Sequence, residues 1–456
     1  MNCILSLLLV VLPIVRLTGN FGHDYSEATV DLITETDTIT GMRAKVKWRG
    51  GSTNRGDKHK RNYNVKFLDE DGEKQNRSFF GFRSDNHWNL CGALDDYARI
   101  RNLVCTELWL DMARKPYYSD REPNALSGAR ARLVELYIND EYRGIYTFGE
   151  IVDRKQMKLK KYKNDTFRGM LWKGMHWTSA TMMHWGVPEY DDSSAVWHDM
   201  KLMYPDIDEV CPTDWHVIHD AGVFVDTSSY EEFDDSVATY FDLPVLIDYF
   251  IFLNVIFGAD NCGKNMFWAC YDQSKDKKLT LAVWDLDVTF GQSTNAETIR
   301  PERFGPEKDF MRWNNLYVLT RLRYYPHYRQ MIYDRYKELR RDIISPDSLY
   351  ARFSNYYDML DAAGAIQREE EKWSGDSDLA GNVLDISDEM EFIRDYIYKR
   401  MKYLDNYMSY YNATAEINET LAPADDDDRM YDLSGRRIWE IPAKGIYIRN
   451  GRKYVR

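Results

Sequence analysis

Alternating apolar and polar residues in the first third of the chain predict β-strands. Residues 44–67 read AKVKW, then a polar loop containing GGSTNRGD, then YNVKF, which indicates a β-hairpin. A second hairpin is predicted where residues 131–138 and 142–148 flank a turn at Asn139-Asp140. Over residues 100–112, apolar positions instead recur every three or four residues, which is the period of a helix.

The second half of the chain carries longer helical patterns. Residues 244–257 (PVLIDYFIFLNVIF) are apolar nearly throughout, which predicts a buried central helix. Residues 265–271 and 279–284 have strand character, and residues 326–410 show helical periodicity with many charges. We therefore expect an α+β fold with a β-rich N-terminal part and a helical C-terminal part.

Changes in composition suggest where domains begin and end. The main domain is expected at residues 21–410, and within it residues 163–235 read either as an insertion or as a substrate-side lobe. Residues 411–429 contain APADDDDR and form an acidic linker. Residues 430–456 show short strand patterns and an Asn-Gly turn at 450–451. This short β tail is too small to fold alone, so we expect it to dock elsewhere or to act as a sorting signal.

The extreme N-terminus resembles a secretory signal. Residues 4–15 (ILSLLLVVLPIV) are apolar but too few to span a bilayer as a helix, and Leu17-Thr18-Gly19 offers a small-residue cleavage site. We expect residues 1–20 to be a signal peptide and the protein to be secreted or displayed at the cell surface. The alternative is a buried N-terminal helix. No later stretch of about 18 apolar residues follows, so no membrane span is predicted.

Charge and cysteine content narrow the choice of partners. The 456-residue chain has a formal net charge of −13, which disfavours nucleic acid as a partner. A local basic group at Lys58, Lys60, Arg61 and Lys66 suits a small anionic ligand better. The six cysteines match no zinc spacing, and after removal of Cys3 the rest form either one or two disulfides or buried free thiols. The sequence leaves the oligomeric state open.

Asp260 and Asn265 are the first candidates for chemistry. They lie in DNCGKN, where an Asp is followed five positions later by an Asn, between the predicted helix and the next strand. Phosphotransferases of the protein-kinase type use this spacing. The Asp orients an acceptor hydroxyl and takes its proton, and the Asn carbonyl completes a metal's oxygen shell. On its own the pattern is weak, because both residues are common in loops.

Asp285 and Asp287 strengthen this interpretation. They follow an apolar strand in AVWDLDVTFG, and if the strand runs through both, they point to the same face. Two carboxylates among apolar residues repel unless a cation lies between them, and Mg²⁺ or Mn²⁺ prefers such hard oxygen ligands. The alternative is that one of the two caps a helix or pairs with an Arg.

A basic hairpin supplies candidate phosphate contacts. Arg49 and Ser52 flank Gly50-Gly51 in the predicted turn, and Lys60 and Lys66 follow. A glycine-containing turn lets backbone amides approach phosphate oxygens, and the cations neutralise them. Glu150, after the second hairpin, is a candidate partner for orienting one of these lysines. Taken alone, the basic residues are better explained by a solvated hairpin loop, and a solvated surface Glu explains Glu150 equally well.

These motifs together resemble the spore coat protein H (CotH) kinase family. The resemblance extends from about residue 45 to residue 407, and its most specific parts are VELYINDEYRGIYTFGE at 134–150 and Trp284-Asp285-Leu286-Asp287-x-x-Phe290-Gly291. RGGS at 49–52, KRNYNVKF at 60–67, WNL at 88–90, Asp96 with Arg101-Asn102, and the Asp-Asn pair complete it in the same order. The C-terminal tail is similar to tails on exported proteins of Bacteroidetes.

The resemblance implies a highly diverged protein-kinase-like fold that uses ATP with Mg²⁺ or Mn²⁺. It also implies transfer of phosphate to Ser, or Thr, of a protein whose identity is unknown. In this reading Asp260 is the catalytic base, and Asn265, Asp285 and Asp287 are metal ligands. The phosphate contacts are Arg49, Ser52, Lys60 and Lys66. The loop after Ser52 is longer than the family pattern, and the stretch after residue 163 lacks its landmarks.

Two other functions compete with a kinase. A non-catalytic surface scaffold on the same fold fits an exported protein, because free ATP is scarce outside the cell, but it needs no carboxylate pair after an apolar strand. A carbohydrate-binding or hydrolytic protein fits the 13 Trp and 33 Tyr. Glycosidases also use paired carboxylates. That mechanism, however, has no role for the Asp-Asn pair or the basic hairpin.

Overall fold

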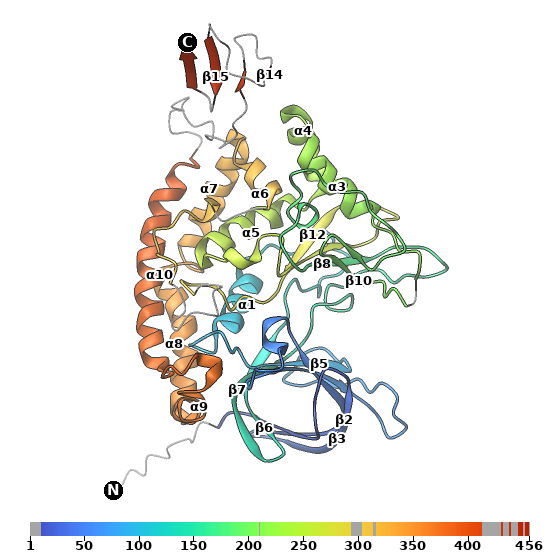
Figure 1. Ribbon diagram of the computed structural model, residues 1–456, viewed down its shortest axis with the longest axis vertical. Coiled ribbons are helices and arrows are strands. Elements are labelled where there is room, and N and C mark those ends of the chain that lie inside the picture. The colour runs from blue at the N-terminus through green and yellow to red at the C-terminus, as the bar shows by residue number, and fades with distance from the viewer. Residues whose placement is uncertain are drawn as a thin grey trace.

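Two parts make up the described protein, a β-barrel and a larger half that combines a second sheet with helices (Figure 1). The structure is a computed structural model that describes residues 11–208, 210–292, 303–312 and 316–412, together with short strands near the C-terminus. The mixed α+β class, with strands concentrated early and helices late, is confirmed.

The N-terminal strands close into a barrel of order β1-β2-β3-β4-β5-β7-β6. Its strands are β1 (Ile14–Thr18), β2 (Ser26–Ile33), β3 (Thr38–Arg49), β4 (Asn62–Phe67), β5 (His87–Cys91), β6 (Ala131–Ile138) and β7 (Glu141–Gly149). Both predicted hairpins are confirmed, as β3–β4 and β6–β7. Alternate residues such as Val46, Val65 and Trp88 are fully buried inside, as the period of a strand requires.

Strand β1 changes the interpretation of the N-terminus. It pairs antiparallel with β2 and parallel with β6, and Val15 and Leu17 are fully buried. The segment expected to be a signal peptide, residues 1–20, therefore contains a strand that closes the barrel. The predicted boundary at residue 20 does not fit this fold, because the alternation Ile-Val-Arg-Leu-Thr builds a strand after the more uniformly apolar stretch. Residues 1–10 lie outside the described part.

A five-stranded sheet of order β12-β11-β8-β10-β9 forms the other β layer. Its strands are β8 (Met170–Gly174), β9 (Val196–Trp197), β10 (Met200–Tyr204), β11 (Met266–Cys270) and β12 (Leu279–Val283). The two strands predicted near residues 265–284 are thus confirmed. The stretch 163–235 differs from the predicted insertion, because β8 lies in the middle of this sheet and pairs with β11. The same stretch also forms α2 (Ser179–Met182), α3 (His216–Thr227) and α4 (Tyr230–Tyr240).

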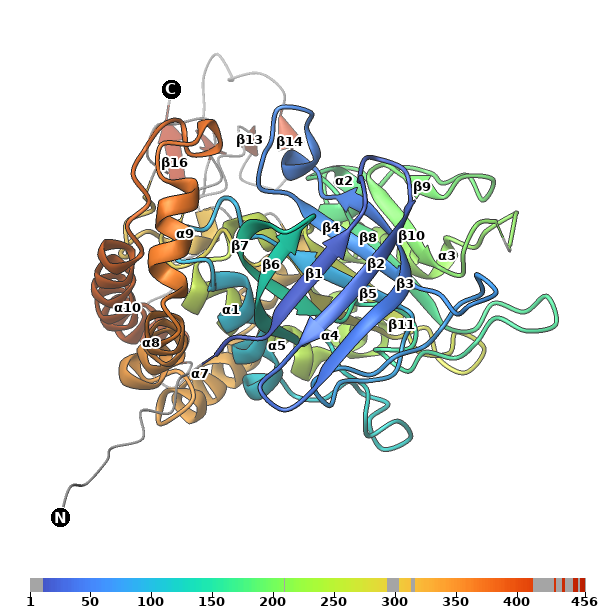
Figure 2. The same ribbon diagram turned by 90° about the horizontal axis from the view of Figure 1, so that it is seen from below.

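Helices pack beside this sheet, and α8, α9 and α10 lie along one side of the barrel (Figure 2). Besides α1 (Arg101–Met112), they are α5 (Leu243–Ile256), α6 (Tyr317–Leu322), α7 (Pro326–Arg340), α8 (Pro346–Ala362), α9 (Ala365–Trp373) and α10 (Ile386–Ser409), with single 3₁₀ turns at Phe310–Arg312 and Ser377–Leu379. Helix α5 is buried from Val245 to Ile256, which explains its apolar sequence. Within the described residues, we find no helix with the length and apolar character needed to cross a membrane.

The tail and the cysteines complete the comparison with expectation. The four C-terminal strands β13 (Met430–Tyr431), β14 (Arg437–Ile438), β15 (Ile446–Arg449) and β16 (Arg452–Val455) form a sheet of order β14-β13-β15-β16. The predicted acidic linker lies outside the described residues, apart from its first two positions. The five described cysteines are all free thiols, but the second alternative expected them to be buried, and only Cys105, Cys262 and Cys270 are.

Candidate active site

Asp260 lies in a tight loop between the central helix and the second sheet. Helix α5 ends at Ile256, a 3₁₀ turn covers Ala259–Asn261, and β11 begins at Met266. The Asp260 carboxylate is 5% exposed and accepts two hydrogen bonds of 2.6 Å, one from Nζ of Lys264 and one from Nδ2 of Asn265. The predicted pair of Asp260 and Asn265 is therefore in direct contact. This hydrogen bond uses Nδ2 of Asn265 and leaves the side-chain oxygen Oδ1 available to a metal ion.

Close packing against β8 holds this loop in place. The Asn265 amide donates to the carbonyl of Gly174 at 3.1 Å. A Cβ atom at Gly174 would lie 1.8 Å from the carbonyl oxygen of Gly263, so only glycine fits. The end of β8 therefore sets the position of the candidate base.

The second acidic segment is tied to the first by hydrogen bonds. Nδ2 of Asn261 donates to the carbonyls of Trp284 and Asp285, at 2.9 and 3.4 Å. The Leu286 amide donates to Oδ1 of Asn102 at 2.9 Å. The loop that follows β12 is thus fixed both to the Asp260 loop and to α1.

Asp285 and Asp287 lie on this loop and not on the strand. Strand β12 ends at Val283, and Asp285 has a left-handed backbone with φ of 59°. The condition that one strand carries both carboxylates on a single face is therefore not met. The turn nevertheless brings both towards Asp260, as their electrostatic influence on one another shows.

The carboxylates of three loops share one region. Burial raises the pKa of Asp287 well above its ordinary value, and the charges of Asp285, Asp95 and Asp260 add to that shift. Burial also raises the pKa of Asp260, against the nearby Lys264 and with help from Asp285. The pKa of Asp95 is raised by burial as well, with Asp285 contributing. Such mutual effects require short distances.

The donor set fits a hard divalent cation. Among the described residues, no hydrogen-bond donor or cationic side chain contacts the carboxylate of Asp285 or Asp287. Crowded, partly buried carboxylates without a partner are costly unless a cation neutralises them. Mg²⁺ and Mn²⁺ prefer oxygen ligands of this kind. Asn265, Asp285 and Asp287 are the residues that would hold such an ion.

Cations border the acidic region, Arg49 from barrel strand β3 and Lys173 from strand β8 of the second sheet. The Arg49 guanidinium lies 5.1 Å from the Trp284 ring centre, and Nζ of Lys173 lies 5.4 Å from it. Burial lowers the pKa of Lys173 to about 8, while Asp285 opposes that shift and Arg49 adds to it. Arg49, Trp284 and Asp285 line one pocket, together with Asn102 of α1. This pocket places positive charge beside the carboxylates.

The structure places the other predicted phosphate contacts less favourably. Ser52 begins a 3₁₀ turn, Ser52–Asn54, directly after the Gly-Gly pair, and its side chain lies outside the described part. Lys66 lies towards the other end of β4, where its Nζ is 4.6 Å from the Tyr25 ring centre. It does not line the pocket that contains Arg49.

The expected phosphate contact at Lys60 is wrong. Its side chain is fully buried, and Nζ bonds Glu369 of α9 at 2.8 Å and the Ile145 carbonyl at 3.2 Å. Burial lowers the pKa of Lys60 to about 7, against the attraction of Glu369. The residue joins the barrel to the helical half and does not face the carboxylate cluster. Its partner lies 309 positions further along the chain, where local sequence gives no indication of it.

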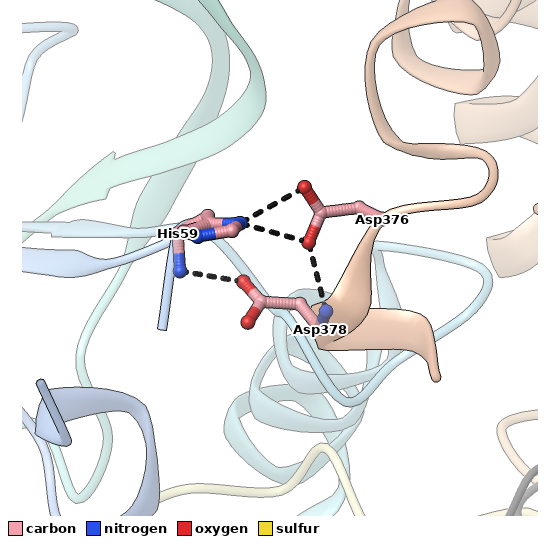
Figure 3. A group of neighbouring side chains, drawn as sticks. All are labelled: His59, Asp376 and Asp378. Atoms are coloured by element: carbon pink, nitrogen blue, oxygen red, sulfur yellow. Dashed lines mark hydrogen bonds and ion pairs between the residues drawn. The ribbon is translucent and has the colours of Figure 1, made fainter. Parts of the chain in front are cut away.

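Neighbouring residues strengthen the same connection (Figure 3). Nδ1 of His59 contacts Asp376 at 3.0 Å, and the amides of His59 and Lys60 both donate to Oδ2 of Asp378 at 2.8 Å. His59, Asp376 and Asp378 have the composition of a metal site, with ligand atoms within 4.8 Å of one another. Because they already bind one another, we assign them a structural role.

The expected role of Glu150 is also wrong. Its carboxylate binds the Arg130 guanidinium at 2.8 Å, Nε2 of Gln156 at 2.9 Å and the Arg83 amide at 3.1 Å. It therefore orients an arginine beside the barrel and no lysine. The buried Lys-Glu pair of this protein is instead formed by Lys60 and Glu369.

Sequence reasoning missed three residues of the site. Lys264 stands inside the DNCGKN motif, and its position four residues after Asp260 would have indicated an ion pair. Asp95 is next to Asp96, which had already been noted for the family pattern. Lys173 gave no signal, because it lies in the stretch that has no recognisable motif.

Comparison with known proteins agrees with this geometry. The model of a family described as CotH kinase protein matches residues 46–404, which includes every residue of the carboxylate cluster. A search of curated proteins gave no match.

Proposed function

Because this chain belongs to the CotH kinase protein family, we propose that it is an atypical protein kinase that transfers the γ-phosphate of ATP to Ser or Thr of another protein. The family match supports a kinase in general terms. Three finer statements belong to the proposal. They are the transfer to a protein hydroxyl, the use of ATP with Mg²⁺ or Mn²⁺, and a protein-kinase-like arrangement of the barrel and the helical half.

One observation carries this proposal above all. Asp260 comes from one loop and Asp285 and Asp287 from another, yet the charge of Asp285 raises the pKa of Asp260, and the charges of Asp285 and Asp260 both raise the pKa of Asp287. Carboxylates that meet beside an apolar core cost free energy unless a cation neutralises them. A divalent cation and a triphosphate give such an arrangement a purpose.

The residues divide the chemistry between them. Asp260 orients the acceptor hydroxyl and takes its proton as that oxygen bonds to the γ-phosphorus and ADP leaves. Arg49 from the barrel and Lys173 from the second sheet neutralise phosphate oxygens. Asn265, Asp285 and Asp287 would hold a divalent ion, which would supply further charge neutralisation. When ATP binds, the Lys264 ammonium moves from Asp260 to a phosphate oxygen. This movement leaves one oxygen of the Asp260 carboxylate free to accept the proton of the acceptor hydroxyl.

Mass spectrometry of the intact protein after incubation with Mn²⁺ and ATP tests this function. We expect a mass gain of one or more phosphoryl groups. In Asp285→Asn the rate of this gain should fall at least about a hundredfold, because positioning and charge neutralisation dominate phosphoryl transfer. Asp334→Asn on the exposed side of α7 is the matched control and should retain full activity. A gain of one adenylyl group would replace phosphate transfer by AMP transfer.

A non-catalytic scaffold is the second candidate, and one observation favours it. Both oxygens of Asp260 are already bonded, to Lys264 and to Asn265. In a scaffold this closed arrangement would be permanent. Thermal unfolding of the protein with and without Mn²⁺ and ATP separates the two, since a kinase is stabilised by its substrate and a scaffold is not.

Export remains part of the proposal. Its support is the apolar stretch at residues 4–15 and the similarity of the C-terminal tail to tails on exported proteins. Since β1 begins at Ile14, we propose that any cleavage of the N-terminus occurs before this strand.

A further inference from the structure

A groove rich in cations lies on the side of the barrel where β7 leads into the second sheet. Two adjoining pockets form it, and they share Arg83, Lys155 and Lys158. The first adds Arg114, Lys115 and Arg130, and the second adds Arg154, Lys160 and Lys161. We call these nine residues and the surface between them the basic groove. No carboxylate lines the first pocket, and only Glu122 lines the second.

The acids that balance part of this charge lie beneath the surface. Lys155 pairs with Asp85, Arg130 with Glu150 and Arg114 with Asp248, and all three carboxylates are buried. These pairs fix the walls of the groove, because each cation is held from behind.

Other cations of the groove have no such partner. Among the described residues, Lys115, Lys158 and Lys161 have no carboxylate within ion-pair distance. The groove is therefore positive on a chain whose net charge is −13. A concentration of unpaired cations against the overall charge attracts an anionic partner at this place.

The groove is also partly apolar, which restricts the kind of anion. Phe82, Leu110, Pro116, Pro123 and Leu126 line the first pocket between the cations. Phe82 is held by the Arg130 guanidinium, 4.8 Å from its ring centre. A phosphate polymer has no apolar groups to pack against these residues. A polypeptide with acidic and apolar side chains can contact both the cations and the apolar residues. An acidic protein also repels long nucleic acids.

The groove is separate from the candidate active site. Glu150 lines the pocket that contains Arg49 and Asp285, and its ion-pair partner Arg130 lines the basic groove. The Arg130–Glu150 pair thus stands between the two. A partner in the groove would leave the carboxylate cluster open.

We propose that the basic groove binds an acidic, partly apolar segment of a partner protein. This inference goes beyond the proposed kinase activity and does not depend on it, because binding requires only the groove.

Fluorescence anisotropy with the full-length protein tests the proposal. The probe is a fluorescein-labelled peptide of Glu-Glu-Leu repeats at about 50 mM salt, where surface charges are little screened. The double variant Lys115→Glu with Lys161→Glu changes one cation in each pocket. We expect its dissociation constant to rise at least about tenfold, because like charges now face the peptide. The control Lys337→Glu with Lys402→Glu makes the same charge change on exposed positions of α7 and α10.

Three results would overturn the proposal. The first is equal weakening in both double variants, which would show only a general effect of net charge. The second is tighter binding of inorganic polyphosphate than of the peptide, which would assign the groove to phosphate polymers. The third is a peptide of Glu alone that binds as tightly as the Glu-Glu-Leu peptide, because the apolar residues would then have no role. Activity towards ATP enters none of these measurements.

Discussion

At the residue scale, two left-handed positions stand out at the carboxylate cluster. Asn265 has φ of 52° and Asp285 has φ of 59°. Short polar side chains tolerate this conformation better than others, although it still costs free energy. Strain of this kind persists only where the surroundings impose it, and here the Gly174 carbonyl and the Asn261 amide hold the two residues. The backbone therefore gives up some stability to position two side chains that we propose as oxygen ligands.

The crowding of carboxylates leads to a prediction for Asp287→Asn. Because burial raises the pKa of Asp287, its contribution to stability is complete below its ordinary pKa and is lost as the pH rises through the raised pKa. In the presence of a chelator, the variant should unfold at a temperature about 2 °C or more above that of the unaltered protein at pH 8, and the gain should shrink towards pH 4. Calorimetry at several pH values measures this difference.

Addition of Mn²⁺ provides the complementary observation. The unaltered protein should gain stability from the ion, and Asp287→Asn should lose most of that gain while its phosphotransfer activity also disappears. An equal response of both proteins to Mn²⁺ would remove Asp287 from the ligand set.

Lys173 gives a pH-dependent prediction for catalysis. With its pKa lowered to about 8, the side chain loses its charge as the pH rises from 7 to 9. We expect kcat/KM for ATP to fall over this range, because a neutral amine no longer attracts phosphate. In Lys173→Arg the guanidinium stays charged, so this fall should be absent. Steady-state kinetics of both proteins decide the matter, and parallel profiles would exclude Lys173 from phosphate binding.

The sequence allowed only part of the site to be predicted. The sequence allowed four candidates to be predicted, because short spacings connect them to apolar elements that end at the same place: Asp260, Asn265, Asp285 and Asp287. Lys60 and Glu150 were assigned incorrectly because their partners are set by tertiary packing. The groove cations were not noticed, since they come from segments between residues 83 and 161 that share no motif.

At the element scale, helix α9 shows the limit of pattern reasoning. Its periodicity predicts a helix, but the pattern does not indicate that Glu369 contacts residues of the barrel. Glu369 is fully buried and binds Lys60, Arg99 and the Ile145 amide, at 2.7 to 2.8 Å. The element type was predictable from sequence, whereas its docking surface was not.

Glu369→Gln should therefore destabilise the protein strongly. The change leaves the cations of Lys60 and Arg99 buried without a carboxylate, which costs about 3–5 kcal/mol. Chemical denaturation should show a lower free energy of unfolding by this amount. Glu371→Gln, two positions along the same helix and exposed, is the control and should change stability by about 0.5 kcal/mol or less. Equal stability of the two variants would mean that the network contributes little.

At the scale of the whole molecule, the barrel meets the helical half through a loop contact and through helix α9. His59 binds Asp376 and Asp378 (Figure 3), and Glu369 of α9 binds the Ile145 amide of β7. Expectation was correct for the hairpins, the central helix and the late helices, because each has a local period. No strand was predicted within residues 163–235, because short strands such as β8 are stabilised by their neighbours and show no period of their own.

Strand β1 carries the last prediction, which concerns the N-terminus as a whole. A protein that starts at Leu12 keeps the strand and should fold, whereas one that starts at Phe21 lacks it and leaves β2 and β6 with unpaired edges. The apolar residues that Val15 and Leu17 cover would also be exposed, so we expect the shorter protein to aggregate or to show no cooperative unfolding. Expression of both, followed by gel filtration and thermal unfolding, compares them directly. If the protein is exported, its mature N-terminus should by the same reasoning lie at or before Pro13. A stable, monodisperse protein that begins at Phe21 would show that the barrel closes without β1 and would restore the boundary predicted at residue 20.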